Sequence, residues 1–167
     1  MLKSKIRNKF LKTRKNSNKK NIQIKFDKIY KLLKKTTNLR NKIVGGYYPV
    51  NYEIDDLNIL GRLEKKKITI SLPSIKKNYK MNFIKCSLNA PFVLNQYGIP
   101  EPSSGTVVNP DILLVPLVAF DKNLNRLGYG GGYYDRLIES LKKKKKIITI
   151  GLAFDFQESN SIPTSKY

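Results

Sequence analysis

A glycine-rich segment holds the residues of this sequence whose types and spacing are best suited to chemistry. The string NRLGYGGGYYDR, residues 125–136, has glycine at positions 128, 130, 131 and 132. Glycine permits positive φ and lets a ligand come close to main-chain N–H groups. A helix expected directly after the glycines adds unpaired N–H donors and the positive end of its dipole. We therefore predict that this segment binds phosphate.

Three charged residues flank these glycines, namely Arg126, Asp135 and Arg136. An arginine can donate two hydrogen bonds to phosphate oxygens, and an aspartate can hold a Mg²⁺ ion that bridges them. The alternative is a plain glycine-rich turn before a helix, with Asp135 as a favourable partner of the helix dipole. Four glycines, an Asp and two Arg in so short a segment favour the phosphate site.

Two common phosphate-binding loops are excluded by spacing. The pattern GxxxxGK[ST] is absent, because no Lys-Ser or Lys-Thr pair follows the glycines. The dinucleotide pattern GxGxxG also fails, since its last position falls on Tyr133 when counted from Gly128 and on Asp135 when counted from Gly130. The loop must belong to another class of phosphate site.

The composition restricts the chemistry further. There is no histidine and one cysteine, Cys86, so mechanisms that need an imidazole base and sites that need zinc ligands are excluded. A bound metal is expected to be a hard, oxygen-ligated ion such as Mg²⁺. The net charge of +21 raises the alternative of nucleic-acid binding. However, 27 of the 33 basic residues are Lys and 6 are Arg, whereas base-reading proteins rely on Arg forks.

The size and apolar content predict one globular domain that spans residues 1–167. No apolar run is long enough to span a bilayer, and the basic amino terminus is not followed by the apolar region of a secretory signal. A single cysteine allows no internal disulfide. We expect a monomeric protein of the cytoplasm with no membrane partner.

Helical and strand patterns alternate along the chain. Apolar spacing predicts helices over residues 3–15, 22–35, 54–63 and 133–141, with a break at 16–18. Strands are predicted over 42–48, 67–72, 79–87, 111–120 and 147–154. We expect Pro73 to halt the second of these strands and Pro116 to mark a bulge or a strand end in the fourth.

The remaining segments are a proline- and glycine-rich stretch and a lysine run. Residues 89–110 are predicted to form a long functional loop, and lysines 142–146 are expected to lie in solvent. Residues 111–120 and 147–154 are interpreted as buried strands. The alternation predicts a single-domain α/β layered fold, with a central, mostly parallel or mixed β-sheet flanked by helices and with amino-terminal helices.

The segment PLVAFDKNLNRLGYGGGYYDR, residues 116–136, resembles the signature of the 5-formyltetrahydrofolate cyclo-ligase family, also called 5,10-methenyltetrahydrofolate synthetases. Three further strings agree with that family in order and spacing: KSKIR at 3–7, YYPVNYEID at 47–55 and GIPEP at 98–102. The resemblance runs over nearly the whole chain. It implies an enzyme that uses ATP and Mg²⁺ to convert 5-formyltetrahydrofolate into 5,10-methenyltetrahydrofolate, ADP and phosphate.

The same resemblance implies roles for individual residues. Arg126 and Asp135 are the implied catalytic residues, and Asp135 is the implied metal ligand. The implied ATP-binding residues are Lys3, Ser4, Lys5, Ile6 and Arg7, followed by Arg126, Leu127, Gly128, Tyr129, Gly130, Gly131, Gly132, Tyr133 and Tyr134. The implied folate-binding residues are Tyr48, Glu53, Tyr129, Gly130, Gly131, Gly132 and Tyr133.

The sequence departs from the family at its carboxyl end. The family continues beyond the proline near 163 to a further Asp, a second magnesium contact, and a closing strand, whereas this sequence ends at Tyr167. An inactive homologue of the family is therefore one alternative. A basic RNA-associated protein and a sugar-phosphate isomerase on a similar fold are the others, although no acid or base suited to isomerisation stands out.

Overall fold

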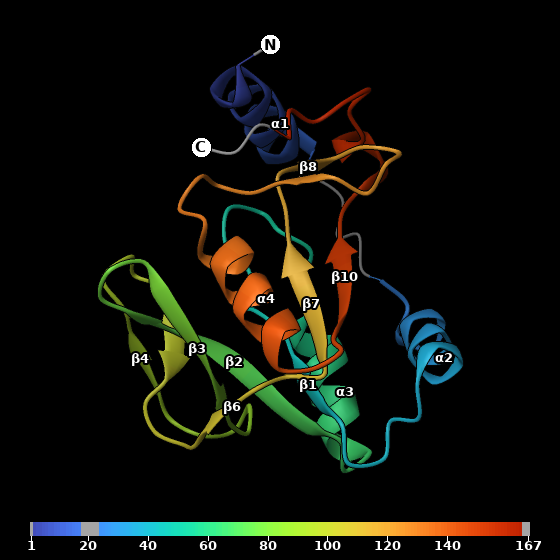
Figure 1. Ribbon diagram of the computed structural model, residues 1–167, viewed down its shortest axis with the longest axis vertical. Coiled ribbons are helices and arrows are strands. Elements are labelled where there is room, and N and C mark those ends of the chain that lie inside the picture. The colour runs from blue at the N-terminus through green and yellow to red at the C-terminus, as the bar shows by residue number, and fades with distance from the viewer. Residues whose placement is uncertain (1, 18–23, 165–167) are drawn as a thin grey trace.

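A mixed six-stranded sheet organises the protein in the computed structural model, which describes residues 2–17 and 24–164 (Figure 1). The strand order is β10-β7-β1-β2-β3-β6. Four neighbouring strands run parallel: β10 (Ile148–Leu152), β7 (Ile112–Pro116), β1 (Ile43–Gly45) and β2 (Thr69–Lys76). β3 (Lys80–Lys85) and β6 (Val107–Val108) continue the sheet in antiparallel pairing. The predicted mixed sheet is confirmed.

Helices cover both faces of this sheet, because the central strand β7 is apolar on both faces. Ile112 and Leu114 pack into one core with residues of α2 (Phe26–Thr36) and α3 (Leu57–Lys65). Leu113 and Val115 point to the other face and share a core with Leu141 of α4 (Tyr133–Lys144). Successive residues of a strand point to opposite faces, so one short apolar run anchors both helical layers.

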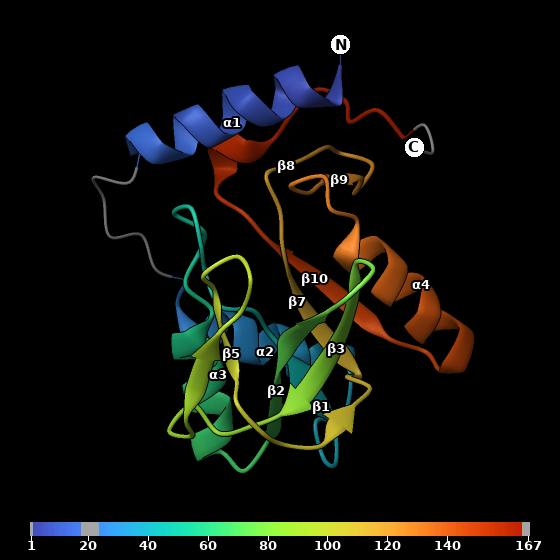
Figure 2. The ribbon, with the colours of Figure 1, turned by 90° about the vertical axis from the view of Figure 1, so that its left-hand side faces the viewer.

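The helix α1 (Lys3–Ser17) lies across one end of the molecule, above the carboxyl ends of the parallel strands (Figure 2). Its apolar residues Ile6 and Phe10 form a separate core with Val118 and Ala119, which follow β7, and with Leu127. The last two belong to a small hairpin of β8 (Ala119–Phe120) and β9 (Arg126–Leu127). The amino-terminal helix is thus held against the segment that leads into the glycines.

Prolines explain two differences between sequence and structure. Pro116 ends β7, as expected, so the predicted strand over 111–120 divides into β7 and β8. The prediction that Pro73 halts its strand is wrong, because β2 continues to Lys76 and pairs Pro73 with Phe83 of β3. Within β2, only Thr69–Ser71 pair with β1. Pro73 therefore lies where β2 pairs with β3 alone, and the missing N–H is tolerated there.

Several element boundaries also differ. The loop predicted over 89–110 contains three short strands, β6 and the hairpin of β4 (Phe92–Leu94) with β5 (Pro100–Pro102). β1 ends at Gly45 instead of residue 48, and α3 begins at Leu57 instead of residue 54. α2 begins at Phe26, and residues 22 and 23 of the predicted helix lie outside the described part of the chain. The break predicted at 16–18 is not seen at 16 and 17, which continue α1, and residue 18 lies outside the description.

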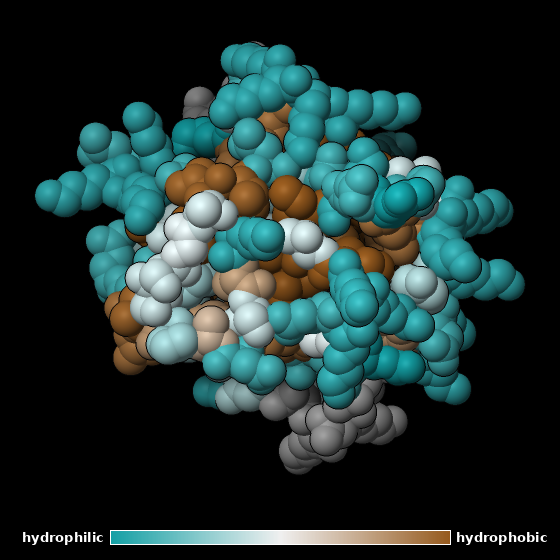
Figure 3. All heavy atoms as spheres, turned by 90° about the horizontal axis from the view of Figure 1, so that it is seen from below, coloured by the Kyte–Doolittle hydropathy of each residue, from teal (hydrophilic) through white to brown (hydrophobic). Residues whose placement is uncertain are grey.

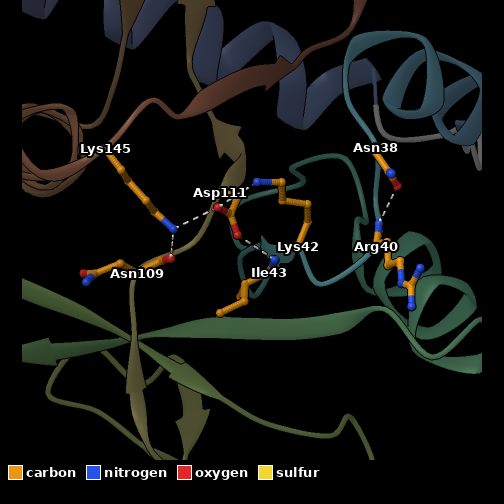
Figure 4. Close-up of polar contacts among 7 residues, drawn as sticks. All are labelled: Asn38, Arg40, Lys42, Ile43, Asn109, Asp111 and Lys145. Atoms are coloured by element: carbon orange, nitrogen blue, oxygen red, sulfur yellow. Dashed lines mark hydrogen bonds and ion pairs between the residues drawn. The ribbon is translucent and has the colours of Figure 1, made fainter.

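The prediction of a buried strand at 147–154 needs correction, whereas the prediction of solvent-exposed lysines at 142–146 is confirmed for all but Lys145. β10 is an edge strand of the sheet in which Thr149 and Gly151 are exposed and only Leu152 is buried, so the strand is not fully buried. Lys145 does not extend into solvent, because its Nζ lies 3.0 Å from a carboxylate oxygen of Asp111 (Figure 4). Asp111 also accepts a hydrogen bond from the backbone N–H of Ile43 at 2.9 Å and pairs with Lys42. One carboxylate therefore ties together the starts of β1 and β7 and the end of α4.

One face of the molecule is largely polar (Figure 3). On the face opposite α1, hydrophilic side chains form most of the outline and apolar residues are visible between them (Figure 3). No helix in residues 2–17 or 24–164 is both long and apolar enough to cross a bilayer.

Candidate active site

A cavity of about 620 Å³ lies beyond the carboxyl ends of β1 and β7. It is lined by residues from distant parts of the chain: α1, the segment after β1, β2 and β3, the hairpin of β4 and β5, the end of β7, the glycine loop at 128–132 with its flanks, and Pro163. The carboxyl ends of parallel strands are the usual place for ligand sites in open α/β sheets. The cavity contains most of the residues that the sequence singled out.

The glycine loop leads from β9 directly into α4, so the predicted order of glycines and helix is confirmed. Two of its residues have positive φ, Gly130 at +106° and Gly132, the residue before the helix, at +66°. Both conformations favour glycine over any residue with a Cβ. The turn between β8 and β9, which precedes the glycine loop, is held by Asp121. Its carboxylate accepts hydrogen bonds from the backbone N–H groups of Asn123, Asn125 and Ile162.

Arg7 of α1 closes one side of the glycine loop. Its Nε donates a hydrogen bond to the carbonyl of Gly128 at 2.7 Å, across 121 residues of sequence. A Cβ placed on Gly130 would lie 3.4 Å from the guanidinium carbon of Arg7. The guanidinium of Arg7 and the main chain of Gly130 therefore lie within contact distance of each other, and both residues line the cavity.

The five residues 3–7 divide between two faces of α1. Lys3 and Arg7, four residues apart, line the cavity. Ile6 is buried in the core beneath α1, while Ser4 and Lys5 are exposed and do not line the cavity. The structure thus brings two of these five predicted ATP-binding residues to the site.

Arg126 and Asp135 lie at the two ends of the glycine loop and form an ion pair with each other. Both line the cavity, and the Asp135 side chain is 54% exposed at the first turn of α4. The Arg126 guanidinium also lies 5.8 Å from the centre of the Tyr134 ring. The two implied catalytic residues are therefore adjacent, and each holds the other at the mouth of the site.

These residues fit a magnesium ion that takes most of its ligands from elsewhere. Within residues 2–17 and 24–164, no group of three or more His, Cys, Asp or Glu side chains is arranged to hold a metal. Mg²⁺ commonly binds through one or two carboxylates and completes its shell with phosphate oxygens and water. Asp135, at a cavity suited to phosphates, matches that pattern.

Arg136, the other arginine beside the glycines, points away from the cavity. Its guanidinium donates to the backbone carbonyls of Gly131 and Tyr79 and lies over the rings of Tyr79 and Tyr133. It does not line the cavity. Arg136 therefore joins the start of α4 to the turn between β2 and β3, and is not placed to contact a ligand.

Glu53 and Tyr48, after β1, both line the cavity. One carboxylate oxygen of Glu53 accepts a hydrogen bond from the backbone N–H of Val50 at 2.8 Å. The other, Oε1, is buried and has no hydrogen-bond partner among the described residues. Burial raises the pKa of Glu53, and the Val50 N–H, the Tyr129 hydroxyl and the Arg14 charge act against that rise. A carboxylate in the wall of the cavity suits a ligand that donates N–H groups.

The β4–β5 hairpin adds a wall that residue-by-residue reasoning missed. The hydroxyl of Tyr97, between the two strands, lies 2.8 Å from that of Tyr133 at the start of α4, and their rings meet edge to face. Asn95, Gly98 and Ile99 line the same wall. The sequence signals for it were the expectation that the segment 89–110 is functional and the family-like string at 98–102. Tyr47 and Arg14, which the sequence did not single out either, lie beside Glu53 and Tyr129.

A second cavity, of about 690 Å³, lies at the opposite ends of β1 and β2. Its lining includes Lys34, Arg40 and Lys67. It contains none of the residues predicted to bind ATP, folate or metal. The cavity at the glycine loop is therefore the candidate active site.

Comparisons with known proteins agree with this geometry. The family model of the 5-formyltetrahydrofolate cyclo-ligase family matches residues 1–167. The chain is 35% identical over 134 residues to the 5-formyltetrahydrofolate cyclo-ligase of Haemophilus influenzae. The match covers 75% of this chain and 71% of that protein. It is 36% identical over 115 residues to the enzyme of the same name from Mycoplasma genitalium. That match covers 66% of this chain and 58% of the Mycoplasma protein.

A solved structure has the same fold. The NMR structure of Aquifex aeolicus 5,10-methenyltetrahydrofolate synthetase superposes with a TM-score of 0.78 at 31% identity, over 100% of this chain and 85% of that one. The mixed sheet and the flanking helices are thus those of a synthetase of this kind. By sequence and by structure, the chain belongs to the 5-formyltetrahydrofolate cyclo-ligase family.

Proposed function

We propose that this protein catalyses the ATP-dependent cyclisation of 5-formyltetrahydrofolate to 5,10-methenyltetrahydrofolate, with release of ADP and phosphate. One observation carries the proposal. A single cavity joins a cationic glycine loop at the start of a helix to a buried carboxylate with an unused oxygen. The first half suits a nucleotide phosphate, and the second suits the N–H donors of a pterin ring.

The nucleotide half consists of three cations and the loop main chain. Lys3, Arg7 and Arg126 line the cavity around the glycines, and α4 begins directly after them, so its amino-terminal end lies at the same region. These groups balance the charge of the phosphates and hold the terminal phosphoryl group in a fixed orientation. The uncovered glycine backbone allows the close approach.

The folate half consists of Glu53, Tyr48 and the tyrosines of the loop. Glu53 Oε1 accepts N–H donors from the pterin, and aromatic side chains, including Tyr97 and Tyr133, supply flat apolar walls. Because Tyr129 belongs to the glycine loop and Tyr133 directly follows it, the two substrates share one wall of the site. The formyl group and the terminal phosphate are therefore brought together.

The reaction needs a poor leaving group to become a good one. The formyl oxygen attacks the γ-phosphorus, the bond from phosphorus to ADP breaks, and a formyl phosphate ester forms. The N10 nitrogen then attacks the formyl carbon, loses its proton, and phosphate leaves with the former formyl oxygen. The protein contributes orientation and charge balance, through Arg126 and the loop N–H groups.

Magnesium forms part of the proposal. Asp135 would hold it, with phosphate oxygens and water as the remaining ligands, and the ion would offset charge on the phosphates. Arg126 would then move its contact from Asp135 to the nucleotide. A cavity formed within one chain also suits a monomer, and we propose a cytoplasmic enzyme. No observation favours an RNA-associated protein, an isomerase or an inactive homologue.

The test is turnover by the purified protein. With 5-formyltetrahydrofolate, ATP and Mg²⁺, we expect the absorbance of the methenyl product to rise and one ADP to form for each product molecule. Omission of ATP or of the folate should abolish both signals. ATP binding without methenyl product would refute the proposed function.

A further inference from the structure

Arg14 is a buried cation behind the candidate active site. It lies on α1, seven residues after Arg7, and is 2% exposed. One of its terminal nitrogens donates to the carbonyl of Leu117 at 3.0 Å, and the other donates to the hydroxyl of Tyr129 in the glycine loop. Its guanidinium carbon also lies 5.7 Å from the centre of the Tyr129 ring. Arg14 does not line the cavity, whereas Tyr129 does.

A buried guanidinium is unfavourable unless an anion is near. Glu53 is the carboxylate on which the charge of Arg14 acts, since Arg14 lowers the pKa of Glu53. It acts in the same sense on the pKa of Tyr129 and Tyr47. Arg14 therefore partly compensates the burial of the Glu53 carboxylate without touching the cavity.

The hydroxyl of Tyr129 connects these two charges. Because its oxygen accepts a hydrogen bond from Arg14, its own proton is available to the Glu53 carboxylate, and a hydrogen-bond interaction between Tyr129 and Glu53 contributes to the pKa of both. The three residues come from α1, the glycine loop and the segment after β1. Arg14 therefore donates to Tyr129, and Tyr129 interacts with the Glu53 carboxylate, whose residue lines the cavity.

We propose that Arg14 is a positioning residue for the folate half of the site: through Tyr129 it orients the Glu53 carboxylate toward the substrate. The inference rests on the proposed function and deepens it. It also links the two substrates, because α1 carries Arg7 at the glycine loop and Arg14 behind Glu53. A helix that holds the nucleotide thereby supports the residue that recognises the folate.

The test compares Arg14→Met, Arg14→Lys and Tyr129→Phe with the wild-type enzyme. Lys15→Met is the matched control, because it removes the same charge from an exposed position one residue away. The readouts are kcat and KM for 5-formyltetrahydrofolate as functions of pH, and binding of the same folate by calorimetry. Circular dichroism checks that each variant is folded.

Arg14→Met should lower kcat/KM for the folate about 10- to 100-fold, the loss typical of a hydrogen bond to a charged group. Arg14 lowers the pKa of Glu53, so its removal should move the acidic limb of kcat/KM to higher pH. The other titratable groups that interact electrostatically with Glu53 are Tyr47, Asp56, Tyr129 and Tyr134, and all remain in this variant.

Arg14→Lys should recover part of the loss, since lysine keeps the charge without the planar fork. Lys15→Met should stay within about twofold of wild type.

A double variant separates positioning from simple anchoring of α1. If Arg14 acts through Tyr129, Arg14→Met combined with Tyr129→Phe should cost little more than Arg14→Met alone. Additive losses, or an acidic limb that stays in place, would overturn the inference while leaving the proposed function intact. A wild-type protein that neither binds nor converts the folate would refute both.

Discussion

Replacement of Glu53 by glutamine should separate substrate recognition from stability, because the two should change in opposite directions. Glutamine keeps the size of the side chain and one oxygen for the Val50 N–H, which Glu53 now accepts at 2.8 Å. The glutamine NH₂ then occupies the position of Oε1, the buried oxygen that has no partner among the described residues. A donor therefore replaces the acceptor that the pterin N–H groups need.

The magnitude follows from that exchange. Loss of a hydrogen bond to a charged acceptor, together with two donors left facing each other, costs about 3 kcal/mol, or roughly a 150-fold fall in kcat/KM for 5-formyltetrahydrofolate. KM for ATP should change by less than about threefold, because Glu53 lies on the folate side. The acidic limb of the pH profile that Glu53 produces should disappear.

Stability should respond in the other direction. Burial raises the pKa of Glu53 above its value in the unfolded chain, so the stability that Glu53 contributes is present below the unfolded pKa and lost as pH rises through the folded pKa. Glutamine does not ionise. The melting temperature of the ligand-free Glu53→Gln variant should therefore equal or exceed that of wild type at pH 8, with a difference that shrinks toward pH 4.

Steady-state kinetics at several pH values and thermal melting without ligands measure both effects. Glu139→Gln is the control, since the exposed Glu139 makes only a surface ion pair with Lys143, and it should leave both properties within error. Wild-type folate kinetics in Glu53→Gln, or a melting temperature clearly below wild type at pH 8, would refute the reasoning.

Three other substitutions test the remaining parts of the site and fold. Asp135→Ala should reduce turnover by about 100-fold or more and weaken the dependence of rate on Mg²⁺ concentration; normal activity would remove Asp135 from the metal role. Arg7→Met removes a cation and the hydrogen bond to Gly128, so KM for ATP should rise about tenfold or more, whereas an effect on folate KM alone would contradict the assignment. Gly45→Ala places a Cβ 2.6 Å from the ring of Phe83, so urea denaturation should show a loss of about 1–3 kcal/mol; an unchanged midpoint would show that the core relaxes freely.

The sequence predicted those features that depend on short stretches of chain. Gly130 and Gly132 indicate a loop with positive φ, because few other residues adopt that conformation. The helix after them is predicted by the pattern of the residues that form it. The apolar run that became β7 predicted a strand covered on both faces, and cores on both faces are observed. Each of these signals lies within about twenty residues.

Features that depend on distant contacts could not be predicted in this way. Arg14 reads as one more basic residue of a helix, and its role depends on Tyr129, 115 residues away. Pro73 was expected to halt its strand, but whether a strand tolerates proline depends on the number of its neighbours, which only the sheet order reveals. Tyr97 likewise gains its place from a contact with Tyr133.

The central claim is that one cavity holds the nucleotide and the folate together, and a crystal structure with 5-formyltetrahydrofolate and a non-hydrolysable ATP analogue tests it most directly. We predict phosphates against the N–H groups of the glycine loop and the guanidinium of Arg7, and the pterin within hydrogen-bond distance of Glu53. A nucleotide bound elsewhere, for example in the cavity beside Lys34 and Arg40, would contradict the claim.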